Sequence, residues 1–474
     1  MKRRFFSLVL SLIFASSVLA GMATQVNARE GVAYADRPFY QMDTTFHPEK
    51  DELTGHMVVT LPEKRTEPQN EVYFRLYPNA FQNWKHKVSK PEKPGYIRVF
   101  HVKVDGKSVE PDIKETVMKV QLPRPLQDGQ SARIEMDFLL HLPRGGMRLN
   151  TFKNTAFLAQ WYPMLAVRDQ HGWHTEPYTT TGDPFYSVMS DFEVTFRLPE
   201  GYRVISTGNN KNQPAGSKIT IKQDQVRDFA AVLTKDYRSV SGKYKDIQVN
   251  LWYMNGMEDV AKPLLEAAVS GMKFYSEKFG PYPYDEVDVV LGETGEGIAG
   301  MEYPGLVTSI PKIGTKKGIQ PAVNVVVHEL AHQWWYGVVG NNQAKEPWLD
   351  EGLTTFSEFL YMEEKMKEDE RELLERASKK ADEIHQTAGI SSAQPLYDYP
   401  EPVYGLMVYI RPAAMLYELM DEIGKEKVLE ILRTYYHRYQ YKVATTRDFI
   451  RTANEVAGKD LTPFFQKWLY FKEA

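Results

Sequence analysis

The sequence has 474 residues, more than one small domain needs, which indicates two or three domains. Hydrophobic residues make up 42% and charged residues 25%, which excludes a largely disordered, collagen-like or multi-span membrane protein. The formal net charge of -4 gives no indication of nucleic acid as a partner, and the absence of cysteine excludes disulfides, a cysteine nucleophile and thiolate metal sites. Any metal must therefore be bound by histidines and carboxylates.

The first 28 residues have the features of a secretory signal peptide. Basic residues 2–4 precede an apolar stretch over 5–20, and small-residue cleavage patterns end at Ala20 and at Ala28. The apolar stretch is shorter than the roughly 20 residues that a membrane-spanning helix needs. We expect 1–28 to be removed after one of these alanines, leaving a mature chain without a membrane span, and the alternative is an uncleaved N-terminal anchor. Secretion without cysteine suits a bacterial cell exterior.

The first half of the mature chain is typical of β-strands. Segments such as 71–76, 132–138 and 191–198 alternate polar with apolar residues, as a sheet with one solvent-exposed face requires. Turns rich in Pro and Gly separate these segments. We therefore predict an N-terminal domain of antiparallel strands over residues 29–250.

The pattern becomes helical from about Asp259 and stays helical to the C-terminus. The charges over 368–383 are typical of a solvent-exposed helix face. We predict a second, mostly helical domain over residues 251–474, which makes the fold class α+β with two domains.

An apolar run that follows Pro321 contains His328 and His332, four positions apart, with Glu329 between them. On a helix this spacing puts both imidazoles on one face, where they can bind one metal while the glutamate reaches a water on it. The run is apolar nearly all round and should be buried, and burying these three polar side chains without partners would be costly. A metal is therefore favoured over the alternative, a chance match of satisfied core histidines.

Glu351 follows in a second predicted helix and is a candidate third ligand. Two histidines and one glutamate leave a fourth position open for water, which is the catalytic rather than the structural arrangement for zinc. The alternative is a surface acid favoured by the helix dipole. Glu358, further along roughly the same helix face, is a candidate partner for a ligand histidine. We predict one Zn2+ bound by His328, His332 and Glu351, with Glu329 as general base.

The pair of histidines, followed by Glu351 within Trp-Leu-Asp-Glu-Gly, resembles the zinc aminopeptidases of family M1, which include aminopeptidase N and leukotriene A4 hydrolase. The resemblance implies a thermolysin-like catalytic domain that removes residues from peptides with a free N-terminus. It also implies a short form without the large C-terminal helical domain of longer members, and hence a more open site.

Residues 297–305 are similar to the G-A-M-E-N strand of that family. The resemblance implies that Glu302 binds the free α-amino group of the substrate and that the neighbouring backbone, including Gly300, pairs with the peptide. This chain departs from the motif, since Ala-Gly replaces Gly-Ala and Tyr replaces Asn. Gln160 resembles a substrate-facing glutamine of the family, but an aromatic residue follows where a second amine-binding acid often stands.

Tyr409 lies in a segment that resembles the family's V-Y-E-K-G-A helix, although Ile-Arg-Pro replaces Glu-Lys-Gly. The resemblance implies that its hydroxyl donates a hydrogen bond to the developing oxyanion. Tyr404 is the alternative donor.

These patterns together predict a secreted zinc-dependent aminopeptidase. A zinc endopeptidase on the same site is the nearest alternative, and a non-catalytic extracellular binding module is an alternative from another class. Neither the preferred N-terminal residue nor the oligomeric state follows from these patterns.

Overall fold

The structure is a computed structural model that describes residues 36–86, 90–209, 218–292, 299–310 and 318–471. The predicted signal peptide, residues 1–28, lies outside the described residues. Within the described ranges, no helix combines the length and apolar character that crossing a membrane requires.

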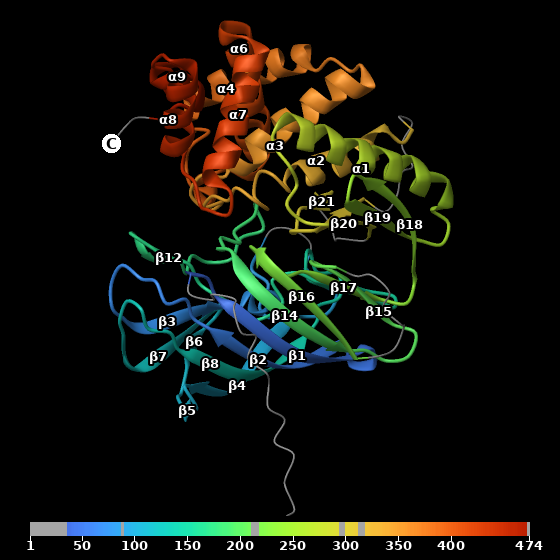
Figure 1. Ribbon diagram of the computed structural model, residues 1–474, viewed down its shortest axis with the longest axis vertical. Coiled ribbons are helices and arrows are strands. Elements are labelled where there is room, and N and C mark those ends of the chain that lie inside the picture. Colours follow the sequence, from blue (N-terminus) through green and yellow to red (C-terminus); the bar gives the residue numbers. More distant parts are fainter. Residues whose placement is uncertain (1–35, 87–89, 210–217, 293–298, 311–317, 472–474) are drawn as a thin grey trace, which may run out of the picture. The chain divides into compact units, whose positions relative to one another are not determined.

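The first half of the chain forms the predicted β-rich region (Figure 1). The largest sheet has the strand order β16 (Lys218–Val226), β14 (Ser190–Arg197), β1 (Phe39–His47), β2 (Glu52–Thr60), β8 (Arg133–His141), β4 (Tyr96–Val104) and β5 (Lys107–Ser108). Side chains along β1 alternate strictly between half-buried and buried, as the period of a one-sided sheet predicts. One pair departs from the predicted antiparallel arrangement: β1 and β14 pair in parallel, because a long connection separates these two strands in the chain.

Smaller sheets complete this half. One has the order β15 (Arg203–Ser206), β17 (Ala231–Thr234), β10 (Thr155–Leu158) and β9 (Asn150–Phe152). Another has the order β11 (Met164–Leu165), β3 (Gln69–Arg75), β7 (Val117–Leu126) and β6 (Asp112–Lys114), and β12 (Arg168–Asp169) pairs with β13 (Gly172–Trp173). Inward-facing side chains of these strands share one hydrophobic core.

A five-stranded sheet begins the second half, with the order β18 (Tyr237–Tyr244), β19 (Ile247–Met254), β20 (Glu286–Leu291), β22 (Leu306–Ser309) and β21 (Gly300–Met301). The domain boundary predicted at 250/251 therefore falls inside β19, and this half begins near Tyr237. Strand periodicity is the same in both halves, so the sequence pattern cannot show which sheet β18 and β19 join. Their inward side chains belong to the core of the second half.

Helices form most of the rest of the second half, from yellow-green for the first of them through orange to red in Figure 1. They are α1 (Glu258–Lys278), α2 (Gln320–Ala331), α3 (Trp348–Tyr361), α4 (Arg371–Ala388), α5 (Glu401–Tyr404), α6 (Arg411–Ile423), α7 (Lys425–Tyr439), α8 (Thr446–Ala457) and α9 (Thr462–Leu469), with π-helical turns at Met362–Met366 and Gly405–Ile410. Pro321 lies in the first turn of α2, where its missing N–H costs no hydrogen bond. The mixed α+β fold is as predicted.

A separate cluster of buried side chains joins the two halves beside β21. Phe157 and Val232 from the first half pack with Val290, Met301 and Leu306 from the second. These contacts fix the edge strand β21 in place, and β21 leads directly into the site.

Candidate metal centre and substrate cavity

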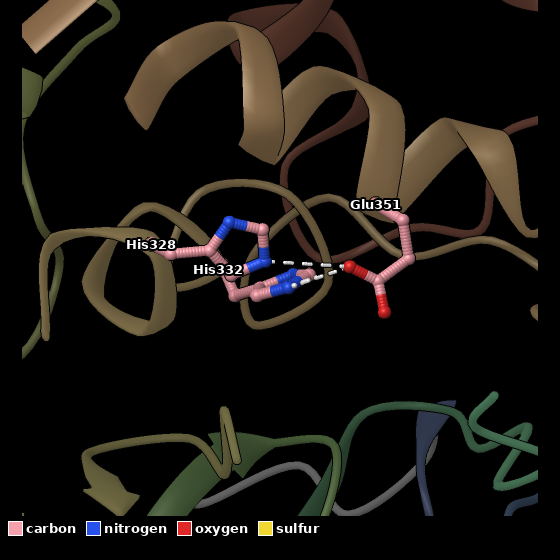
Figure 2. Close-up of side chains that lie close together, drawn as sticks. All are labelled: His328, His332 and Glu351. Carbon is pink, nitrogen blue, oxygen red and sulfur yellow. Dashed lines mark ion pairs between the residues drawn. The ribbon is translucent and has the colours of Figure 1, made fainter. Parts of the chain in front are cut away.

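Helices α2 and α3 bring together the three predicted ligands (Figure 2). His328 lies in the last turn of α2, and His332 follows directly after the helix ends at Ala331. Glu351 lies in the first turn of α3 and is buried. Its Oε2 atom lies 3.5 Å from Nε2 of His328 and 3.2 Å from Nε2 of His332. His332 lies one residue beyond the last residue of α2, yet both imidazoles point toward the glutamate.

The donor set fits one zinc ion. Two atoms that each lie about 2.0–2.1 Å from a tetrahedral ion are about 3.3 Å apart, close to both separations. The Oε2 atom of Glu351 is buried and accepts no hydrogen bond, so one oxygen of this carboxylate is left for a cation. His328, His332 and Glu351 are also one of the groups whose ligand atoms all lie within 4.8 Å of one another. Two imidazoles and one carboxylate are the ligands of catalytic zinc sites.

The other ring nitrogens of both histidines have partners that fix the rings. Nδ1 of His328 lies 3.0 Å from Oε2 of Glu358, the partner that the sequence suggested. Nδ1 of His332 lies 3.0 Å from the carbonyl oxygen of Trp335 and 3.1 Å from the hydroxyl of Thr354. A carboxylate or carbonyl at Nδ1 holds the tautomer in which Nε2 is free to bind a metal.

The electrostatics of the site favour a bound cation. Burial by itself would lower the pKa of His332, but the negative charges of Glu351 and Glu302 outweigh it and raise the pKa to about 10. Without a metal, a proton therefore compensates this concentration of carboxylates. A zinc ion would replace such protons, because metal ligands bind in their deprotonated form.

Glu329 faces the same cavity and is 7% exposed. Burial raises its pKa to about 7, against the lowering effect of the two ligand histidines. Gly300 of β21 lies directly against it, since a Cβ atom there would come within 2.4 Å of Oε1 of Glu329. A glycine is thus required for the edge strand to approach the predicted base this closely.

Tyr409, in the π-helical turn Gly405–Ile410, is the tyrosine that contacts the ligand set. Its hydroxyl donates a hydrogen bond of 2.5 Å to Oε1 of Glu351, and its ring stacks on the imidazole of His328. Burial and the charge of Glu351 raise the pKa of this phenol well above its ordinary value, so it remains a donor. Tyr404 also lines the cavity but packs edge-on against the Tyr409 ring.

Glu302 follows β21 and lines the cavity with 5% of its surface exposed. Its main-chain carbonyl accepts a hydrogen bond from Gln333, whereas no donor among the described residues reaches its carboxylate. Burial and the negative charge of Asp183 raise the pKa of this carboxyl well above the usual range. The side chain is therefore a buried acceptor without a partner.

Sequence reasoning missed two residues of the cavity, Arg148 and Asp183, which come from the β-rich half. Both are buried, and Nη2 of Arg148 donates to Oδ1 of Asp183 at 2.5 Å and to the carbonyl of Gly182 at 3.0 Å. Neither residue belongs to a recognisable motif, and only the fold brings them to the site.

Gln160 does not take its predicted place facing the substrate. It is 3% exposed, and its amide donates to Oδ2 of Asp228 at 2.8 Å. It is not among the described residues that line the cavity. This hydrogen bond to the buried Asp228 carboxylate holds the Gln160 side chain in the interior.

The cavity has a volume of about 640 Å³ and is lined by both halves of the chain. Carboxylates predominate among its charged groups: Asp183, Glu302, Glu329, Glu351, Glu358 and Glu401. Such a volume accommodates a small peptide, and the excess of acids favours a cationic one.

Comparisons with known proteins agree with this geometry. Residues 264–468 match the family model described as "Peptidase family M1 domain". Aminopeptidase N of Haemonchus contortus is 24% identical over 319 residues, covering 60% of this chain and 32% of that protein. Aminopeptidase N of Lactococcus lactis is 27% identical over 222 residues, covering 43% of this chain and 26% of that protein. The chain thus spans about a third or less of the length of these relatives.

Solved structures show the same fold over most of the chain. An M1 zinc metallopeptidase from Deinococcus radiodurans has a TM-score of 0.67 at 19% identity, covering 92% of this chain and 94% of the other. A mutant of an M1 zinc metallopeptidase from the same organism, described as bound to a Tyr-Ser-Ala substrate, has a TM-score of 0.64 at 18% identity, covering 92% and 94%.

Proposed function

Residues 264–468 belong to peptidase family M1, and on this premise we propose that the protein is a zinc-dependent aminopeptidase. The observation that carries the proposal is the convergence of His328, His332 and Glu351 on one point beside Glu329, in a cavity that also holds the unpartnered Glu302 carboxylate. The proposed substrates are peptides with a free N-terminus, and a short peptide, Tyr-Ser-Ala, is the substrate described for a protein of similar fold.

His328, His332 and Glu351 would hold the zinc ion, which when bound polarises the scissile carbonyl and lowers the pKa of a water toward about 7. Glu329 accepts the proton of the attacking water and passes it to the leaving amine. Burial raises the pKa of this carboxyl above its ordinary value, which favours a group that both accepts and releases a proton near neutral pH. The Tyr409 hydroxyl donates a hydrogen bond to the oxygen on which negative charge develops.

Substrate orientation follows from β21 and Glu302. Since β21 is the edge strand of its sheet, an extended peptide can pair with its backbone at Gly300. The Glu302 carboxylate then receives the terminal ammonium, with which it forms charge-assisted hydrogen bonds. Recognition of this ammonium beside the reacting bond restricts cleavage to the N-terminal residue.

An endopeptidase on the same zinc site is the second candidate, because Gln160 does not line the cavity and an aromatic residue follows it. Both candidates are compared on two peptides of identical sequence, one with a free and one with an acetylated N-terminus. The aminopeptidase proposal predicts that acetylation slows cleavage about 10–100-fold, the loss expected for hydrogen bonds to a charged group. Equal cleavage rates would favour the endopeptidase.

Metal analysis of the same protein distinguishes an enzyme from a non-catalytic binding module. We expect one zinc per chain and loss of cleavage on treatment with a chelator. Protein that binds peptide but holds no metal and cleaves neither form would be a non-catalytic module.

We also propose that the protein is exported, from the basic residues 2–4, the apolar stretch 5–20 and the cleavage patterns ending at Ala20 and Ala28. N-terminal sequencing of protein recovered from the medium or cell envelope is expected to begin at Gly21 or Arg29. A chain that retains Met1 in a membrane fraction would indicate the uncleaved anchor instead.

A further inference from the structure

The cavity contains a second buried carboxylate with an oxygen left unpartnered. Asp183 is 8% exposed and lines the cavity. Its Oδ1 atom accepts a hydrogen bond from Arg148, and no donor among the described residues reaches Oδ2. Asp183 is also the neighbouring charge that acts most strongly on Glu302. Two mostly buried acids thus line one cavity, and each has acceptor capacity left over.

The segment that carries Asp183 is held against the cavity by specific contacts. Gly182 has a φ of 59°, a conformation that favours glycine, and a Cβ atom there would lie 2.3 Å from the hydroxyl oxygen of Tyr404. Arg148 binds the Gly182 carbonyl and the Asp183 carboxylate with the same nitrogen, and its Nε contacts the sulfur of Met301 at 3.1 Å. Since Met301 precedes Glu302 in the chain, Arg148 links the two acids.

An ammonium group matches these acceptors. It carries a positive charge and three donors, so a single carboxylate leaves at least one donor unsatisfied. Two buried acids in one cavity repel each other unless a cation lies near them. The guanidinium of Arg148 offsets one negative charge, and a bound ammonium would offset the other.

We propose that Asp183 binds the terminal ammonium of the substrate together with Glu302, and that Arg148 is the positioning residue that holds Asp183. The inference rests on the proposed aminopeptidase function and deepens it. An acid from the β-rich half thus provides the second amine contact, in place of one beside Gln160. The substrate class is a peptide with an unmodified, protonated N-terminus.

Binding is tested without turnover, on zinc-loaded Glu329→Gln protein, by calorimetry with trialanine and N-acetyl-trialanine. We expect the free amine to bind more tightly, and Asp183→Asn in this background to weaken trialanine about 10–100-fold while leaving the acetylated ligand unchanged. The matched control is Asp191→Asn, which removes another buried acid paired with an arginine, Arg37, that does not line this cavity. This control should alter neither affinity.

Removing Asp183 alone leaves a buried guanidinium without its partner, which can prevent folding. The double variant Asp183→Asn/Arg148→Met removes both charges and is measured in the same way, with the same expected loss for trialanine. Equal weakening of both ligands would overturn the inference, because it would show a structural role. If trialanine binds more tightly than its acetylated form and Asp183→Asn does not change this, the role of Asp183 is overturned, but the aminopeptidase proposal is not. No preference even with Asp183 intact would overturn the aminopeptidase proposal as well.

Discussion

Two histidines in this protein each lie between two carboxylates, in different halves of the chain. His174, next to the β12–β13 pair, has Nε2 2.7 Å from Asp169 and Nδ1 2.9 Å from Glu176. His328 has Nε2 3.5 Å from Glu351 and Nδ1 3.0 Å from Glu358. Judged by their neighbouring carboxylates alone, the two arrangements look alike.

Their difference lies in what remains unpaired. Both acids beside His174 are about 30% exposed, so water satisfies their remaining lone pairs, and the imidazole balances one of the charges when it is protonated. Beside His328, Glu351 is 5% exposed, has an oxygen without a hydrogen bond and faces a second histidine. The first cluster is complete as it stands, whereas the second requires a cation. A buried carboxylate oxygen that accepts no hydrogen bond therefore distinguishes the functional site. A histidine beside an acid does not.

The largest effect is expected from Glu329→Gln. Loss of the proposed general base should lower kcat about 10²–10⁴-fold while zinc content stays at one ion per chain, because no ligand is changed. Steady-state kinetics and metal analysis on the same sample check this. Glu176→Gln, in the His174 cluster, serves as control and should retain full activity. A Glu329→Gln enzyme within tenfold of the unchanged protein would show that another group removes the proton.

Tyr409→Phe should have the next largest effect. Loss of the proposed hydrogen bond to the oxyanion is expected to lower kcat about 10²–10³-fold with little change in KM, since such a donor acts mainly in the transition state. Tyr404→Phe removes a hydroxyl from the same cavity and should cost less than about tenfold. The reverse order in kcat would assign the oxyanion contact to Tyr404.

The sequence predicts those parts of the site that depend on local spacing. His328, Glu329 and His332 are positioned by one helical turn, and Glu351 and Glu358 by two turns of the next helix, so the helical period alone places them on common faces. The same reasoning gives the alternating strands of the β-rich half.

Contacts between distant segments are beyond such reasoning. Arg148 and Asp183 reach the cavity because the β-rich half packs beside β21, and no local pattern encodes that packing. The predicted substrate-facing position of Gln160 is missed for the same reason, since its hydrogen-bond partner Asp228 is 68 positions away in the chain. The predicted domain boundary at 250/251 is displaced because polar and apolar residues alternate in a strand in the same way whichever sheet the strand joins.

A smaller effect is expected from Glu358→Gln. The amide still accepts a hydrogen bond from Nδ1 of His328, but without the negative charge that makes the imidazole a stronger ligand. We expect zinc affinity to fall about 10–100-fold, measured by competition with a chelator of known affinity. Glu176→Gln makes the same change beside His174 and should leave zinc affinity unaltered. Equal zinc affinity in both variants would contradict a metal-supporting role for Glu358.

The smallest effect is expected from His174→Gln and concerns stability alone. Hydrogen bonds to Glu176 and Asp169 raise the pKa of His174 against the lowering effect of burial, so its charged form stabilises the fold below the ordinary pKa of 6.5. That contribution is lost as the pH rises through the raised pKa of the folded state. The variant should lower the free energy of unfolding by about 1 kcal/mol at pH 6, and by less at pH 9.

Urea unfolding of both proteins at pH 6 and pH 9 measures this difference, and the control is His171→Gln, an exposed histidine in the turn between β12 and β13. At lower pH the contribution should also fade, because His174 lowers the pKa of Asp169 and Glu176 and their protonation removes its partners. Zinc content and kcat should not change, since His174 is not among the described residues that line the cavity. A His174→Gln protein that loses zinc would remove the distinction between the two clusters.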